Sequence, residues 1–171
     1  MSNLPARAAV LLCAALTLVA ACGVDDPKRE ESAGLDPAST TVEFVFTDAS
    51  VPPEHHRSFT LTVADGTGTV VVDAYGDEID RDERPVDDEA VTELVEAFNS
   101  GDLDAAFDTE GADCDGGTSL ELTLDDGDTR ESTEVDDCGG GSRAADDLRA
   151  AVAGLLASFD IAELTDGRYV D

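Results

Sequence analysis

The amino-acid sequence predicts an α+β domain in which a largely antiparallel sheet of about five strands carries two helices on one face. Short segments in which apolar and polar residues alternate indicate half-buried strands. Two longer segments, with apolar residues three and four positions apart, indicate amphipathic helices. A leading strand is followed twice by a hairpin and a helix, so the predicted order is β-ββα-ββα.

The first three strands are predicted from alternation and from turn residues. Residues 42 to 46 and residues 59 to 63 each place an apolar side chain at every second position. Asp65-Gly66 then separates the second run from the β-branched run at 69 to 72. An Asp-Gly pair between two such runs is typical of a two-residue hairpin turn.

A first helix is predicted after the polar stretch from Gly76 to Arg84. Asp87 or Asp88 can cap its N-terminus, and Gly101 is placed to end it. The apolar side chains that recur at helical spacing are Val91, Leu94, Val95 and Phe98.

The same pattern returns in the second half of the chain. Residues 120 to 124 alternate, Asp126-Gly127 turns the chain, and residues 129 to 135 form the returning strand. Residues 142 to 159 present one apolar stripe and are predicted to form the second helix. At an offset of 61 residues, the turns and several core positions of the two units coincide. Because any two ββα units share such positions, duplication and a common pattern both remain open.

The N-terminus has the layout of an export signal. Met1 to Arg7 is a short segment with one basic side chain, and residues 8 to 21 are uncharged and mostly apolar. The run ends in Val19-Ala20-Ala21-Cys22, which resembles the lipobox of bacterial lipoproteins. The resemblance implies cleavage before Cys22 and diacylation of that cysteine; an ordinary secretory signal is the alternative.

The export signal divides the chain into three parts. Residues 1 to 21 are predicted to be the lipoprotein signal peptide. Residues 22 to 39 are polar and contain two prolines, so they are predicted to be a flexible tether. Residues 40 to 171 are expected to form a single α+β domain.

The negative charge of the chain excludes nucleic acid as a partner. It has 40 acidic and 10 basic residues, a net charge of −30, and such a field repels nucleic acid and anionic lipid headgroups. The acidic surface is expected to be a solvated one, suited to a salty habitat, with calcium or a cationic partner as the alternative. The EF-hand calcium motif is not completed after Asp80 and Asp82, which are followed by Arg84, or after Asp113 and Asp115, which are followed by Gly117.

Two cysteines remain in the predicted domain, and an exported protein reaches an oxidising compartment. A three-residue loop at residues 125 to 127 would pair Leu124 with Asp128, and the same register would place Cys114 opposite Cys138. The sequence therefore predicts a structural disulfide between Cys114 and Cys138. A redox-active thiol would need a C-x-x-C spacing or a nearby histidine, and neither is present.

The segment between the first two strands holds both histidines of the chain. We expect no metal site and no catalytic role there, because a zinc site needs three or four suitably spaced ligands. Ser58 also lacks the G-x-S-x-G elbow of serine hydrolases. Arg57 is expected to make a structural ion pair. The two prolines stiffen the segment, and we therefore predict that it is a partner-binding loop. The residues of this candidate loop are Pro52, Pro53, Glu54, His55, His56 and Arg57.

Two further resemblances concern the domain. Ser50-Val51-Pro52-Pro53, followed by His56-Arg57-Ser58 and a Thr-rich strand, looks like a stretch in uncharacterised secreted bacterial proteins. The order strand, hairpin, helix, hairpin, helix is similar to the emfourin-type inhibitors of bacterial metalloproteases. The chain lacks the Gly-Gly-Phe stretch of their first loop, so no inhibitory residue is transferred.

Together these features predict a non-enzymatic, lipid-anchored protein on the extracytoplasmic face of the cell membrane, with a binding or structural role. Its expected partners are the membrane, reached through the lipid on Cys22, and an envelope or secreted protein; no cofactor is expected. The alternatives are an inhibitor of an extracellular protease and a metal-binding protein that uses Glu54, His55 and His56.

Overall fold

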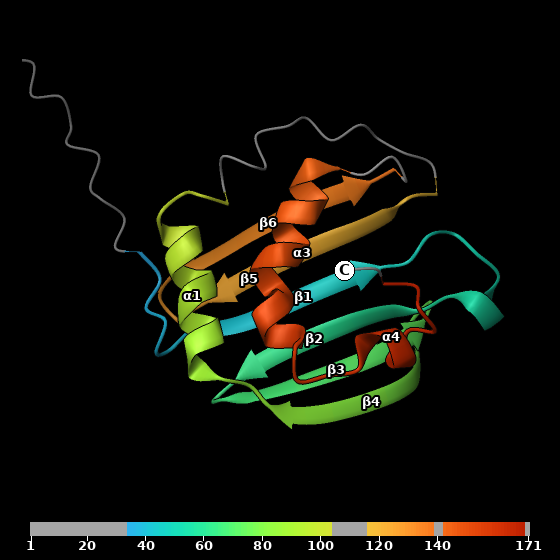
Figure 1. Cartoon of the computed structure of the whole chain (residues 1–171), viewed down its shortest axis with the longest axis horizontal. Coiled ribbons are helices and arrows are strands. Elements are labelled where there is room, and N and C mark those ends of the chain that lie inside the picture. Colours follow the sequence, from blue (N-terminus) through green and yellow to red (C-terminus); the bar gives the residue numbers. More distant parts are fainter. Residues whose placement is uncertain (1–33, 104–115, 139–141, 170–171) are drawn as a thin grey trace, which may run out of the picture. The chain divides into compact units, whose positions relative to one another are not determined.

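The fold is an α+β fold built on one open antiparallel sheet, seen in a computed structural model that describes residues 34–103, 116–138 and 142–169. Residues Ala33–Asp171 form one compact unit, and its strands lie in the order β4-β3-β2-β1-β5-β6 (Figure 1). The strands are β1 (Thr41–Thr47), β2 (Ser58–Ala64), β3 (Thr67–Ala74), β4 (Asp77–Pro85), β5 (Thr118–Asp125) and β6 (Arg130–Asp137). The helical segments are η1 (Pro53–His55), α1 (Asp88–Asn99), α3 (Arg143–Leu156) and α4 (Ile161–Leu164). The predicted fold class is confirmed, with one strand more than expected.

The additional strand is β4, which lies in the stretch that was expected to be a polar connection. Its side chains are almost all exposed, so it lacks the apolar alternation that predicts strands. The chain reverses into it at Tyr75-Gly76, where both residues have positive φ, 55° and 92°. Asp65-Gly66 makes the same kind of turn at 51° and 72°. A charged edge strand is a common protection against edge-to-edge association.

The two hairpin units flank β1 on opposite sides. Phe44 lies opposite Leu61 in β2 and opposite Leu122 in β5, so the offset of 61 residues corresponds to equal positions beside the central strand. The correspondence ends at the turns. Residues 65–66 make a two-residue turn, whereas four residues, 126–129, connect the paired ends of β5 and β6.

The predicted register of the second hairpin is wrong. Leu124 pairs with Glu131, not with Asp128, and Leu120 pairs with Val135. Val135 is the buried apolar residue of β6, and directly opposed side chains point to the same face of a sheet. The predicted register would have turned Val135 to the open face. The observed pairing consequently removes the argument that placed Cys114 opposite Cys138.

Both long helices begin and end close to where the sequence predicted. The Asp87 carboxylate caps α1 by accepting a hydrogen bond from the Glu89 backbone N–H at 3.0 Å, and Gly101 follows the helix at φ 76°. Ser142 caps α3, which ends at Leu156 rather than at residue 159. The short helix α4 was not predicted.

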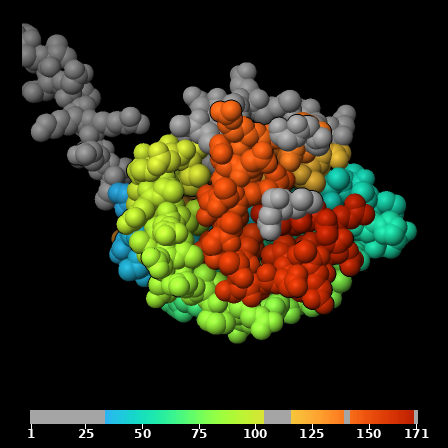
Figure 2. Space-filling model, viewed as in Figure 1, coloured from blue at the N-terminus to red at the C-terminus, as the bar shows by residue number. Residues whose placement is uncertain are grey.

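The helices and the C-terminal segment cover one face of the sheet (Figures 1 and 2). Apolar side chains at alternate positions of β1, β2, β3 and β5 meet the buried sides of α1 and α3. The Tyr169 ring contacts Phe44, Phe46 and Phe59 edge-on, with centroid distances of 5.3 to 6.3 Å. The core therefore includes the last described residue of the chain.

The folded unit begins before residue 40, the predicted boundary. Leu35 is buried in the core. The Asn99 side chain binds its backbone twice, by accepting from the Leu35 N–H at 3.0 Å and donating to its carbonyl at 2.9 Å. The predicted tether is accordingly shorter at its C-terminal end. No helix in the described ranges is long and apolar enough to cross a membrane.

Candidate binding surface at the β1–β2 loop

The loop between β1 and β2, residues 48–57, extends from one end of the sheet (Figure 1). In the space-filling view it stands out at the edge of the body (Figure 2). Its tip is the single turn η1, where His55 N–H donates to the Pro52 carbonyl at 2.8 Å. The side chains of Pro52, Pro53, Glu54 and His55 are exposed. Four of the six predicted loop residues thus lie on an accessible surface.

The buried carboxylate of Asp48 holds the two ends of the loop together. It accepts hydrogen bonds from the backbone N–H of Ala49 at 2.8 Å and of Arg57 at 3.0 Å. The Asp48 backbone N–H in turn donates to Ser58 Oγ at 3.0 Å. A buried carboxylate with several such donors resists rearrangement, because each lost bond would leave a charge unsatisfied. Asp48 was not singled out from the sequence, where one acid among 40 carries no distinguishing signal.

His56 is a buried residue and not part of the loop surface. Only 3% of it is exposed, and its ring stacks on Tyr75 at a centroid distance of 3.9 Å and an interplanar angle of 27°. The Tyr75 hydroxyl donates to the Val51 carbonyl at 2.6 Å. This contradicts the placement of His56 on the loop surface. A contact between the loop and the β3–β4 turn depends on tertiary packing and has no local signal.

Arg57 makes the structural ion pair that was predicted. Its Nε lies 2.9 Å from Asp166 Oδ2, and its Nη1 donates to the His56 carbonyl at 2.7 Å. The partner follows α4, more than a hundred residues away in the sequence. Arg57 therefore attaches the loop to the C-terminal segment and is not a free cation on the surface.

The histidines do not form a visible reactive or metal-binding arrangement. His56 Nε2 is 3.5 Å from Ser58 Oγ, but Ser58 is only 7% exposed, and His56 Nδ1 has no hydrogen-bond partner in the described parts of the chain. His55 is exposed while His56 is buried. Across the described ranges, no group of three or more His, Cys, Asp or Glu side chains is arranged to hold a metal ion.

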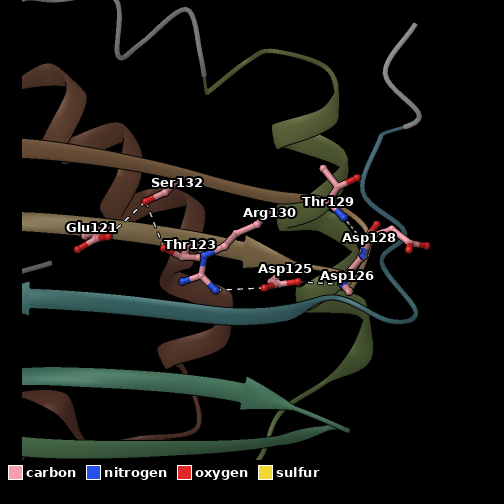
Figure 3. Close-up of polar contacts among 9 residues, drawn as sticks. Glu121, Thr123, Asp125, Asp126, Asp128, Thr129, Arg130 and Ser132 are labelled. Atoms are coloured by element: carbon pink, nitrogen blue, oxygen red, sulfur yellow. Dashed lines mark hydrogen bonds and ion pairs between the residues drawn. The ribbon is translucent and has the colours of Figure 1, made fainter. Parts of the chain in front are cut away.

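A second polar cluster lies at the β5–β6 loop (Figure 3). The Asp126 carboxylate accepts hydrogen bonds from the backbone N–H groups of Thr129, Asp36 and Asp128 at 2.7 to 3.1 Å. These bonds, above all the one from Thr129, lower the pKa of Asp126. Arg130 pairs with Asp125 at 3.1 Å. The cluster ties the loop to the start of the folded unit, and its polar groups are mainly engaged with one another.

Of the three cysteines predicted to be modified or bridged, only Cys138 lies within the described residues. Cys22, the predicted lipidation site, and Cys114 lie outside the described residues. Cys138 directly follows β6. A disulfide between Cys138 and Cys114 stays a prediction.

Comparison with known proteins finds no matching family model and no matching curated protein. The functional account therefore depends on the residues and their geometry.

Proposed function

We propose that this protein is a non-enzymatic, lipid-anchored binding protein of the extracytoplasmic face of the cell membrane, and that it contacts an envelope or secreted protein through the β1–β2 loop. One observation carries the proposal. The loop exposes Pro52, Pro53, Glu54 and His55, while Asp48, the stacked His56 ring and Arg57 hold its ends in place. A loop already held in one shape loses little conformational entropy on binding.

The position of the loop suits an anchored protein. The predicted tether leads into Leu35, before β1, whereas the loop follows the other end of the same strand. A strand of this length spans roughly 23 Å. A lipid on Cys22 would attach the domain through the tether at the end of β1 that lies opposite the loop, and the attachment would leave the loop accessible to a partner.

Capture experiments test the proposal. The four exposed residues, Pro52 to His55, are replaced by Gly and Ser, and Asp48, His56 and Arg57 are kept. Affinity capture from an envelope extract should recover a partner with the wild-type protein and lose it with the replaced loop. A matched variant with four exposed substitutions at Glu131, Glu134, Asp136 and Ser132 of the far edge strand should retain it. Identical sets of captured proteins from all three would remove the loop from the functional account.

The inhibitor alternative is supported by the same stiff, protruding loop, since protease inhibitors present preformed loops to their enzymes. Purified protein should then inhibit at least one secreted protease, and replacement of residues 52 to 55 should abolish the inhibition. Cleavage of the loop at the rate of an unstructured peptide, without inhibition, would reject this alternative.

A further inference from the structure

The exposed large apolar side chains in the described part of this acidic protein belong to the hairpin that contacts the candidate loop. Tyr75, at 57% exposure, and Ile79, at 47%, are the exposed large hydrophobic residues in the described part of the chain. Both belong to the β3–β4 hairpin, Tyr75 in its turn and Ile79 in β4. An exposed aromatic and aliphatic pair on a surface otherwise dominated by charge is typical of a contact site.

Tyr75 occupies a backbone position that disfavours its side chain. Its φ of 55° lies in the left-handed region, where Gly, Asn and Asp are usual and a bulky residue is strained. The equivalent position of the β2–β3 turn is Asp65, at φ 51°. The turn itself therefore does not require tyrosine, and the reason for tyrosine lies in what its ring contacts.

The Tyr75 ring connects the hairpin to the loop. One side of the ring stacks on His56, and the hydroxyl binds the Val51 carbonyl. More than half of the residue still faces solvent. The exposed residues of the loop and of the hairpin that contacts it are together called the loop–hairpin surface. They are Pro52, Pro53, His55, Tyr75 and Ile79.

The charges around this surface define the partner that fits it. Glu54, Asp77 and Asp80 are exposed and make no ion pair within the described residues. The nearby cations are already engaged, Arg57 by Asp166 and Arg81 by Glu78 at 2.9 Å. A second copy of this chain would bring acidic residues against acidic residues, which is unfavourable.

We infer that Tyr75 and Ile79 anchor the partner, an inference that rests on the proposed function. The partner is a basic protein with an apolar recess flanked by Lys and Arg side chains. Tyrosine is among the residues that most often dominate the energy of an interface, particularly when it enters a desolvated pocket. The unpaired acids around it would meet the basic rim and accelerate association.

Site-specific photo-crosslinking on the full chain tests this inference. The photoreactive amino acid p-benzoylphenylalanine replaces Ser50, an exposed loop residue outside the proposed contact set, and a control probe replaces Thr62 in β2. The Ser50 probe should form an adduct that the Thr62 probe does not form. Raising the salt concentration from 50 to 300 mM should reduce the adduct about threefold, because exposed charges are screened.

Three further substitutions are made in the presence of the Ser50 probe. Tyr75→Asn suits the left-handed turn but removes the ring, and it should lower the adduct yield about tenfold. The Ile79 side chain makes no hydrogen bond, so Ile79→Glu and Ile79→Arg form a pair of variants that differ in the sign of the introduced charge. Both should weaken the adduct through loss of the apolar contact, and Ile79→Arg should weaken it several-fold more, because a cation would face the basic rim. Thermal melting of each variant verifies that the fold is retained.

The outcomes separate the inference from the proposed function. Unchanged yields with Tyr75→Asn and both Ile79 variants, together with loss of the adduct when residues 52 to 55 are replaced, would retain the loop and overturn the inference. No adduct from the Ser50 probe would overturn both. An adduct that is a dimer of this chain, or an equal effect of Glu and Arg at Ile79, would reject the basic partner.

Discussion

At the scale of single residues, the two neighbouring histidines have opposite roles. The sequence places them side by side and predicts a surface loop for both. The turn η1 leaves His55 in solvent, and the stack on Tyr75 buries His56. Adjacent residues of a tight turn point in different directions, so proximity in sequence did not imply a shared function.

Replacement of the two histidines should therefore give unequal results. His56→Ala removes a buried ring and its stack, and it should lower the free energy of unfolding by about 1–3 kcal/mol. His55→Ala, the matched control, should change it by less than about 0.5 kcal/mol, as is usual for exposed residues. Chemical denaturation followed by circular dichroism measures both. Equal effects would contradict the burial of His56.

Asp126 should make stability depend on pH. Its pKa is lowered in the folded state, mainly by the hydrogen bond from the Thr129 backbone, so its contribution is present above the unfolded pKa near 3.8. The contribution is lost as the pH falls through the lower, folded pKa. Melting temperatures between pH 5 and pH 2 should fall less steeply for Asp126→Asn than for the wild type.

Asp128→Asn is the control for this experiment, because it removes the same charge from the same loop without removing the three hydrogen bonds to Asp126. It should follow the wild-type curve closely. If both variants flatten the curve equally, the effect is one of net charge and not of the Asp126 hydrogen bonds.

At the scale of elements, local turn chemistry predicted the first hairpin and misled the interpretation of the second. Asp65-Gly66 closes a two-residue turn as expected. The stretch Asp125-Asp126-Gly127 is compatible with loops of different length, and the burial of Val135 selects among the registers. The apolar side chain of Val135 excludes registers that turn it to the open face, but it does not choose between pairing with Leu120, Leu122 or Leu124.

The disulfide remains a prediction at the level of elements. Cys114 precedes β5 and Cys138 follows β6, so a bridge would join the two outer ends of this hairpin. Closing a loop of this length should contribute roughly 3 kcal/mol. Thiol titration of the unreduced, denatured mature protein should find neither cysteine free, and reduction should lower its melting temperature. Two reactive thiols before reduction would disprove the bridge.

At the scale of the whole molecule, the packed part of the chain includes Leu35, which lies within the predicted tether. Leu35→Ala should lower the free energy of unfolding by about 2–3 kcal/mol, because it empties a core position. Val24→Ala changes the other branched aliphatic residue of the predicted tether and should have no measurable effect. Denaturation curves compare the two variants. Indistinguishable curves for Leu35→Ala and the wild type would place the boundary later in the chain.

The lipid anchor is the corresponding prediction for the N-terminus. Mass spectrometry of the mature protein should find a diacylated Cys22 as the first residue, and Cys22→Ala should release the protein from the membrane fraction or stall its processing. A mature N-terminus elsewhere, without lipid, would support an ordinary secretory signal.

The sequence by itself determined the fold class, both long helices, the capping residues of the first, and five of the six strands. These follow from period-two and period-3.6 apolar patterns and from residues that end helices or turn strands. It also predicted that Arg57 makes an ion pair, although not with which residue. Only the tertiary structure decided the partner of Arg57, the burial of His56, the role of Tyr75 and the register of β6. These features depend on contacts between segments far apart in the chain, and a local sequence pattern does not specify which distant side chain a residue will contact.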